Sequence, residues 1–448
     1  MKYTDFNADK IIKLLNDNGY KAYYVGGCVR DALNDNVPND FDITTDALPE
    51  ETVKIFSEAG YTVIETGIKH GTVSVIMAHK PYEVTTFRTE GVYSDNRHPE
   101  SVAFVRDLKE DLSRRDFTIN AMAYNENDGV VDYFSGREDL QNKIIRCVGE
   151  ASVRFEEDAL RILRALRFAS RLGFEIEKNT SKAIREKKHL LKNISAERIF
   201  TEFKGLLMGE NAAKIIREYY DVIGEFIPEI LLLKDCPQNS KWHIYDVFEH
   251  TMVALENTEK DIILRLAVFF HDFGKPHVRT VNAEGKDSFK GHQNVSFDMA
   301  GKILRRLKAD TKTIQSVKIL VLHHDDRIPV DVIAAKKMIK TVGRENALRI
   351  IKMEIADNAA HNPKLIKDRF YELLQLSDIV EKILSDKSAC LEINDLAING
   401  SDIMKLGVKQ GPELGEILKL LLNEVIEEKI QNDRGVLVNY VRNSILKI

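Results

Sequence analysis

The sequence has few cysteines, no long apolar run and no large excess of charge of either sign. Its four cysteines stand far apart and form no Cys-x-x-Cys pair, which excludes a disulfide scaffold and a zinc ribbon. No run approaches the roughly 18 apolar residues of a membrane span, and the first ten residues hold no apolar stretch typical of a signal peptide. We therefore expect a cytoplasmic protein without a membrane partner.

The net charge of −5 gives no argument for nucleic-acid binding from overall charge, so any such binding must use local basic patches. The 448 residues exceed one ordinary domain. Short β-rich segments occur only before about residue 145, and helical periodicity dominates after it. We expect an α+β protein with a head on a small mixed sheet (1–145), a helical neck (146–234), a helical body (235–386) and a helical tail (387–448).

Two glycines and a pair of carboxylates stand close together near the start of the chain. Gly26 and Gly27 predict a turn where the backbone approaches a phosphate closely, and Arg30 is a candidate phosphate ligand. Asp40 and Asp42, at i and i+2 in a segment that favours a strand, share one face. Such a pair is typical of a divalent-metal site for phosphoryl transfer.

Glu83, in a predicted strand over 82–87, is a candidate third carboxylate. With Asp40 and Asp42 it completes a catalytic set for two Mg²⁺ ions. The ordinary alternatives are a turn at the two aspartates, a solvated strand position for Glu83 and a surface ion pair for Arg30.

An arginine-rich segment over 154–172 predicts one long helix. Asp158 and Arg161, at i and i+3, share a face of it. A carboxylate accepts from an exocyclic amine and an arginine donates to ring acceptors, so this pair can select CTP and ATP over GTP and UTP. Arg164 and Arg167 are candidates for further base or phosphate contacts. On spacing alone, an ordinary surface ion pair is the favoured alternative.

A third cluster lies in the predicted body. His271 and Asp272 follow a mostly apolar run, with His250 upstream and Asp357 downstream. Imidazoles and carboxylates of this kind can share one metal ion that activates water for phosphate-ester hydrolysis. The alternative for any one of these histidines is a packed core position.

Taken in order, these motifs resemble the class II, bacterial-type tRNA nucleotidyltransferases. These CCA-adding enzymes belong to the polymerase-β superfamily, as do bacterial poly(A) polymerases. The likeness covers most of the chain and rests on residues 26–31, 40–42, 114–123, 157–161 and 195–199.

The resemblance implies a role for each group of residues. Asp40 and Asp42 would hold the metals. Triphosphate and ribose would be bound by Arg115, Asp116 and Asn120. The amino-acid template for the incoming base would consist of Asp158, Arg161 and Arg164.

The implied reaction adds CCA to the tRNA 3′ acceptor end from CTP and ATP. Residues 93–99 resemble the family's flexible loop, which favours CCA or A addition over CC addition alone. An A-adding enzyme or a poly(A) polymerase is the alternative within the class. Lys405, Lys409 and Lys419 are candidate contacts to the tRNA backbone.

The third cluster resembles an HD domain, for which a divalent transition metal is the candidate cofactor. His292 and either His323 or His324 match the extra histidines of two-metal versions. An HD phosphohydrolase with a nucleotide-sensing head is the alternative of another class. The sequence leaves open the hydrolytic substrate, the identity of this metal and the oligomeric state.

Overall fold

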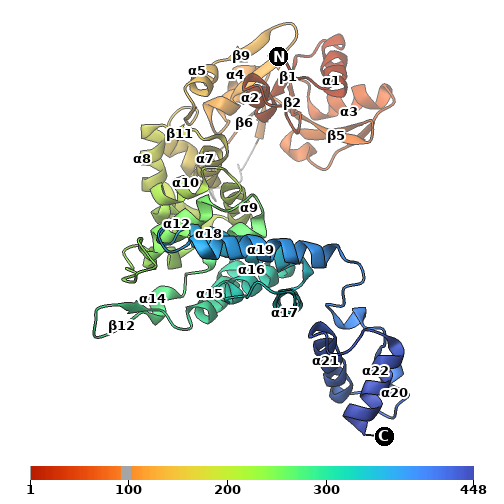
Figure 1. Ribbon diagram of the computed structural model, residues 1–448. Coiled ribbons are helices and arrows are strands. Elements are labelled where there is room, and N and C mark those ends of the chain that lie inside the picture. Colours follow the sequence, from red (N-terminus) through yellow and green to blue (C-terminus); the bar gives the residue numbers. More distant parts are fainter. Residues whose placement is uncertain (1, 92–101, 448) are drawn as a thin grey trace. The chain divides into compact units, whose positions relative to one another are not determined.

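A computed structural model describes residues 2–91 and 102–447 (Figure 1), so the loop at 93–99 lies outside the described residues. The chain divides into two compact units, Met1–Pro228 and Glu229–Ile448. The four-part division expected from the sequence is finer than these units and stays a prediction. None of the described helices is long and apolar enough to cross a bilayer.

A seven-stranded mixed sheet forms the base of the head, with the strand order β3-β4-β5-β2-β1-β8-β9. Only β2 and β5 pair in parallel within it; the other described pairs of this sheet are antiparallel. Alternate residues of β4 are buried, as expected for a strand with one face on the core. The strands are β1 (Ala22–Val25), β2 (Ile43–Thr45), β3 (Thr62–Ile64), β4 (Thr72–Met77), β5 (Lys80–Thr86), β8 (Met122–Asn125) and β9 (Gly129–Asp132).

Short helices and one hairpin surround this sheet. Gly26 adopts a left-handed φ of 77° immediately before α2 (Gly27–Leu33), and an added Cβ there would lie 3.2 Å from Nη1 of Arg115. This position therefore requires glycine. The surrounding elements are α1 (Phe6–Asp17), α2 (Gly27–Leu33), α3 (Pro49–Glu58), the β6 (Arg88–Glu90) and β7 (Val102–Phe104) pair, α4 (Leu108–Ser113) and α5 (Gly136–Gln141).

The rest of the first unit is helical, apart from the short strand pair β10 (Ile144–Ile145) and β11 (Glu175–Ile176). The prediction of a single helix over 154–172 is wrong, because this segment forms two helices that meet at Asp158. Asp158 has extended backbone and its carboxylate accepts from the Leu160 N–H, a local bond that competes with helix continuation. The helices are α6 (Ala151–Glu157), α7 (Leu160–Leu172), α8 (Lys178–Lys187), α9 (Ala196–Leu207), α10 (Ala212–Glu218) and α11 (Tyr220–Ile223).

The second unit packs around α13, whose residues from Leu264 to Phe270 are all buried. A helix that is buried on every side must be surrounded, and α12, α15, α16 and α18 contact it. The last segment of the second unit, from Cys390 to Val441, has a separate apolar core built on α21. The helices are α12 (Val247–Glu256), α13 (Ile262–Phe270), α14 (Lys275–Val278), α15 (His292–Arg306), α16 (Thr311–His323), α17 (Val332–Val342), α18 (Ala347–Ala359), α19 (Lys367–Ser385), α20 (Gly400–Met404), α21 (Pro412–Ile426) and α22 (Arg434–Tyr440).

Candidate active site and metal centre

Three carboxylates gather at one end of the β2 and β5 pair. Asp40 and Asp42 immediately precede β2, rather than lying within it. The parallel register pairs Ile43 with Val84, so Asp42 stands beside Glu83 on the neighbouring strand. Desolvation and the negative charge of Glu83 raise the pKa of the Asp42 carboxyl, and Arg115 opposes that rise. A group of carboxylates whose charges repel one another in this way is suited to a divalent cation.

A chain of hydrogen bonds lies behind the glycine turn. Nη1 of Arg30 donates to Oδ1 of Asn120 at 2.6 Å, and Nδ2 of Asn120 donates to Asp116 at 3.1 Å. Arg164 then donates to Oδ2 of Asp116 from Nε at 2.8 Å and from Nη2 at 2.6 Å. Arg30 also pairs with its neighbour Asp31 at 2.7 Å. The structure thus joins four of the predicted nucleotide-binding residues through direct contacts.

Phe168 supports the arginines of this region. Its ring centre lies 5.2 Å from the guanidinium carbon of Arg30, 5.5 Å from that of Arg164 and 4.4 Å from that of Arg167. Such cation–π contacts fix guanidinium groups without neutralising them. Neither Phe168 nor Glu202, which binds Arg167 at 2.5 Å, was identified from the sequence, since neither stands in a recognisable motif.

Asp158 and Arg161, expected to act as a pair, have separate partners here. Asp158 forms an ion pair with Arg198 at 3.1 Å. Arg161 donates to Glu157 at 2.6 Å and to the carbonyl oxygen of Arg114 at 3.1 Å. Arg198 is a further residue that sequence reasoning did not identify, although it lies in the 195–199 motif. Its contact shows that α9 supports the start of α7.

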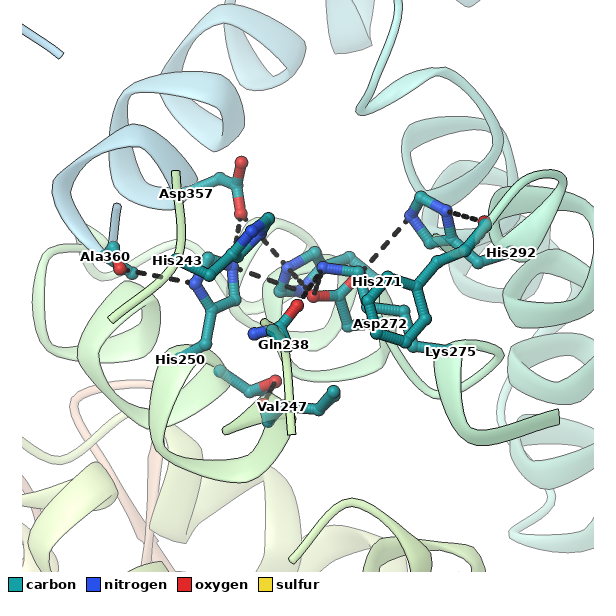
Figure 2. A network of polar contacts seen from close by, with 12 residues as sticks. Gln238, His243, Val247, His250, His271, Asp272, Lys275, His292, Asp357 and Ala360 are labelled. Atoms are coloured by element: carbon teal, nitrogen blue, oxygen red, sulfur yellow. Dashed lines mark hydrogen bonds and ion pairs between the residues drawn. The ribbon is translucent and has the colours of Figure 1, made fainter. Parts of the chain in front are cut away.

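The predicted HD residues meet in the second unit. Nε2 of His250 lies 2.7 Å from Oδ1 of Asp357, and Nε2 of His271 lies 3.2 Å from Asp357 and from Asp272. Figure 2 shows these side chains converging from α12, from the end of α13 and from α18. His292 approaches Asp272 at 3.3 Å from the opposite side. Two sets therefore share Asp272 and place their ligand atoms within 4.8 Å of one another: His250, His271 and Asp272, and Asp272, His292 and His324.

The second set contains His324 rather than its neighbour His323. Nε2 of His324 lies 3.1 Å from Nε2 of His292. His323 instead turns outward and pairs with Asp326 at 2.6 Å. Adjacent residues of a helix differ by about 100° in direction, so only one of the two can face the cluster.

Each of the four clustered histidines directs Nδ1 at a backbone carbonyl oxygen, which can only accept. Their Nε2 atoms point at the carboxylates or at another imidazole of the cluster, where a metal ion would replace any Nε2 proton and leave the proton on Nδ1. Such a carbonyl partner is typical of metal-binding histidines. The pairs are His250 with Ala360, His271 with Val268, His292 with Phe289 and His324 with Val321, at 2.6–3.4 Å.

Electrostatics of the cluster also fit a cation. Burial lowers the pKa of His324 to about 3, so its imidazole is neutral at pH 7. Asp272 and Asp357 outweigh burial and raise the pKa of His271 to about 10. Nε2 of His271 and both Asp272 oxygens are buried without a hydrogen bond of normal geometry, although Lys275 Nζ lies 2.6 Å from Asp272. A divalent cation would satisfy these atoms and replace the His271 proton.

A cavity of about 450 Å³ opens onto this cluster. Besides the predicted ligands, its lining includes Lys275, His243 and His361. An isolated β-bridge brings His243 next to His361. Both histidines lie in non-helical segments, where no local periodicity indicates that they meet.

Comparisons with known proteins agree along the chain. Residues 22–146 match the family described as the poly A polymerase head domain, residues 173–222 the probable RNA- and SrmB-binding site of polymerase A, and residues 292–441 the putative tRNA nucleotidyltransferase domain 2. The CCA-adding enzyme of Streptococcus pyogenes serotype M1 is 33% identical, over 97% of this chain and 96% of its own length. That of Pediococcus pentosaceus is 35% identical over 97% of each. The crystal structure of the Bacillus stearothermophilus CCA-adding enzyme in complex with CTP is 31% identical, with a TM-score of 0.71 over 97% of this chain and 95% of that one.

Proposed function

Because the chain belongs to the family of CCA-adding enzymes, we propose that Asp40, Asp42 and Glu83 catalyse the addition of C, C and A to tRNA 3′ ends from CTP and ATP. The observation that carries this assignment is the parallel register that sets Asp42 beside Glu83. Two Mg²⁺ ions held there would polarise the α-phosphate and lower the pKa of the attacking hydroxyl.

Residues around the glycine turn bind the nucleotide. The backbone at Gly26 and Gly27 approaches the triphosphate, as the left-handed φ of Gly26 permits. Arg30 and Arg115 supply positive charge. The buried Asn120, itself bound to Asp116, holds Arg30 in place, and Asp116 and Asn120 contact the ribose.

The reaction is an in-line displacement. The tRNA 3′-hydroxyl oxygen forms a bond to the α-phosphorus and loses its proton, and the bond to the β-phosphate oxygen breaks, which releases pyrophosphate. tRNA is held through shape and backbone contacts, since every tRNA must be accepted. Among the candidate lysines, Lys419 pairs with Glu416 at 2.8 Å and Lys405 with Asp402 at 3.7 Å, so Lys409 is the strongest candidate.

Base selection is proposed for the start of α7. Asp158 and Arg161 face the incoming base once a nucleotide separates them from their present partners, Arg198 and Glu157. Arg164 and Arg167 line the same helix and are fixed on Phe168. The expected preference is for CTP and ATP, because both present an exocyclic amine to a carboxylate.

The experiment that tests this function uses three tRNA transcripts, ending before CCA, after CC and after CCA. Each is incubated with every NTP alone and with CTP plus ATP. Ordered addition of C, C and A that stops at CCA confirms the proposal. A single A on the CC-ended tRNA alone would indicate an A-adding enzyme, and unlimited A tails would indicate a poly(A) polymerase.

A second function is favoured by the cluster in the second unit. We propose that His250, His271, Asp272, Asp357, His292 and His324 hold one or two divalent transition metals. A metal bound there would activate water for phosphate-ester hydrolysis. The backbone carbonyl oxygen that faces Nδ1 of each of the four histidines supports this assignment.

Hydrolysis of p-nitrophenyl phosphate by the metal-loaded chain tests this second function. Asp272→Asn removes activity and bound metal together if the proposal holds. Since Asp272 lies outside the head, CCA addition by the same variant serves as the control for folding.

All four cysteines are free thiols, which supports the cytoplasm as the location for both activities.

A further inference from the structure

One wall of the hydrolytic cavity is formed by a histidine outside the proposed ligand set. The ring of His243 lies 5.4 Å from that of His250 and 4.6 Å from that of His361. His243 lines the cavity, and Figure 2 shows it beside His250 and the Asp357 carboxylate. The β-bridge to residue 361 fixes its backbone, so this position is built into the fold.

The hydrogen bonds of Ser240 indicate which ring nitrogen of His243 carries the proton. Oγ of Ser240 accepts the backbone N–H groups of Trp242 and His243, each at 3.3 Å. Both hydroxyl lone pairs are then occupied, so its one proton points to Nδ1 of His243, 2.8 Å away. Nδ1 is therefore an acceptor, and a neutral His243 carries its proton on Nε2.

This tautomer disfavours metal binding of His243 through Nε2, because a ligand nitrogen needs a free lone pair and Nδ1 would then lose the hydrogen bond that it accepts from Ser240. The Nε2–H group has no hydrogen-bond partner among residues 2–91 and 102–447. A donor without a partner that lines a cavity beside a metal cluster complements an anion held by that cluster.

We propose that His243, fixed in the Nε2–H tautomer by Ser240, donates a hydrogen bond to a phosphoryl oxygen of the phosphate ester in this cavity. The inference rests on the hydrolytic function proposed for the site. A phosphoryl group offers several acceptor oxygens, and metal ions held by the cluster can bind only some of them. His243 contacts another from its place beside His250, and Ser240 is its positioning residue.

The test measures binding of inorganic phosphate to the Mn²⁺-loaded full-length chain by calorimetry. His243→Ala is expected to weaken binding by about ten- to a hundredfold, the range of a hydrogen bond to a charged group. His243→Gln keeps an N–H donor near the Nε2 position and is expected to restore most of the affinity. Bound Mn²⁺ is expected to be unchanged in both variants.

A second readout needs neither metal nor activity. The ring ¹⁵N chemical shifts of His243 in the metal-free chain report which nitrogen carries the proton. A protonated Nε2 in the wild-type chain, with a mixture of tautomers in Ser240→Ala, supports the assignment. Protonation at Nδ1 in the wild-type chain overturns it.

Further outcomes separate this inference from the hydrolytic function. Loss of Mn²⁺ in His243→Ala would make His243 a ligand and overturn the inference. Equal phosphate affinity in wild type and His243→Ala, or no phosphate binding at all, would overturn it too. If phosphate affinity depends on His243 but p-nitrophenyl phosphate is not hydrolysed, the binding role stands and only the hydrolytic function fails.

Discussion

Nη2 of Arg164 lies 2.6 Å from Oδ2 of Asp116 and ties helix α7 to the loop that follows α4 in the head. Arg164 and Asn120 outweigh the effect of burial and lower the pKa of the Asp116 carboxyl to about 2. Asp116 is thus ionised at neutral pH and depends on Arg164 for its charge compensation. The same contact connects the proposed triphosphate site to the helix that carries the proposed base-selecting residues.

Arg164→Ala should therefore affect both stability and nucleotide binding. Leaving Asp116 buried without its cation should cost about 2 kcal/mol of the free energy of unfolding, less than for a fully buried pair because Arg164 is partly exposed. The KM for CTP and ATP should rise. Urea denaturation and initial-rate kinetics measure the two effects. Arg171→Ala, an exposed position on the same helix, is the control and should change neither; equal behaviour of the two variants would contradict this prediction.

Nucleotide selection should relax when Arg161 is replaced by alanine. A base pair-like contact of this kind discriminates by about 1–3 kcal/mol, so misincorporation of UTP and GTP should rise roughly ten- to a hundredfold relative to CTP and ATP. Arg154→Ala is the matched control, since Arg154 binds the same Glu157 at 2.9 Å but has no proposed contact to the base. An unchanged nucleotide profile in an active Arg161→Ala enzyme would remove the template role from this residue.

Glu354 should make the second unit less stable as pH rises. Burial raises the pKa of its carboxyl to about 7 from an ordinary value of 4.5, although Arg369 lies 2.5 Å away. Between these pH values the folded state keeps a proton that the unfolded chain releases, so the free energy of unfolding falls as pH rises.

The variant Glu354→Gln still accepts a hydrogen bond from Arg369 but does not titrate. Its free energy of unfolding should therefore fall by about 2–3 kcal/mol less than that of the wild type as pH rises. Denaturation of the metal-free chain at pH 4.5, 5.5, 6.5 and 7.5 tests this. Parallel stability curves for the wild-type and variant chains would show that Glu354 does not titrate in this range.

Metal binding should distinguish two adjacent histidines. His324→Ala should reduce the bound transition metal, whereas His323→Ala should not, because only His324 faces His292 and Asp272. A metal present at a hundred times its Kd stabilises the fold by about 2.7 kcal/mol, so the wild-type and His323→Ala chains should show a higher Tm with metal. Metal content by mass spectrometry gives a direct reading, and equal losses in both variants would refute the assignment of the second site.

Local patterns in the sequence predicted that the head contains a mixed sheet, but they did not identify β8 and β9 as two of its strands. The strand expected over 82–87 overlaps β5 (Lys80–Thr86), because apolar and polar side chains alternate along it as in a pleated strand. Asp42 and Glu83 were identified separately, but their adjacency depends on the parallel register of β2 and β5. The register between two strands that are distant in sequence cannot be derived from the residues of either strand alone.

Tertiary contacts explain what could not be predicted. The break at Asp158 depends on a side-chain bond to the backbone of Leu160, which helix periodicity does not indicate. The choice of His324 over His323 depends on the orientation of α16. His243 joins the cavity only through a bridge to His361, so no local motif identifies it.

The most direct measurement extends a tRNA transcript that lacks CCA, with CTP and ATP, by the wild-type chain and by Asp42→Asn side by side. Wild type should add C, C and A and stop. Asp42→Asn should be slower by roughly a thousandfold, because several kcal/mol of charge stabilisation is lost at about 1.36 kcal/mol per factor of ten, while its Tm and that of the exposed control Asp17→Asn stay near wild type. Extension by Asp42→Asn at a rate close to wild type would contradict the assignment of the head carboxylates as the catalytic site.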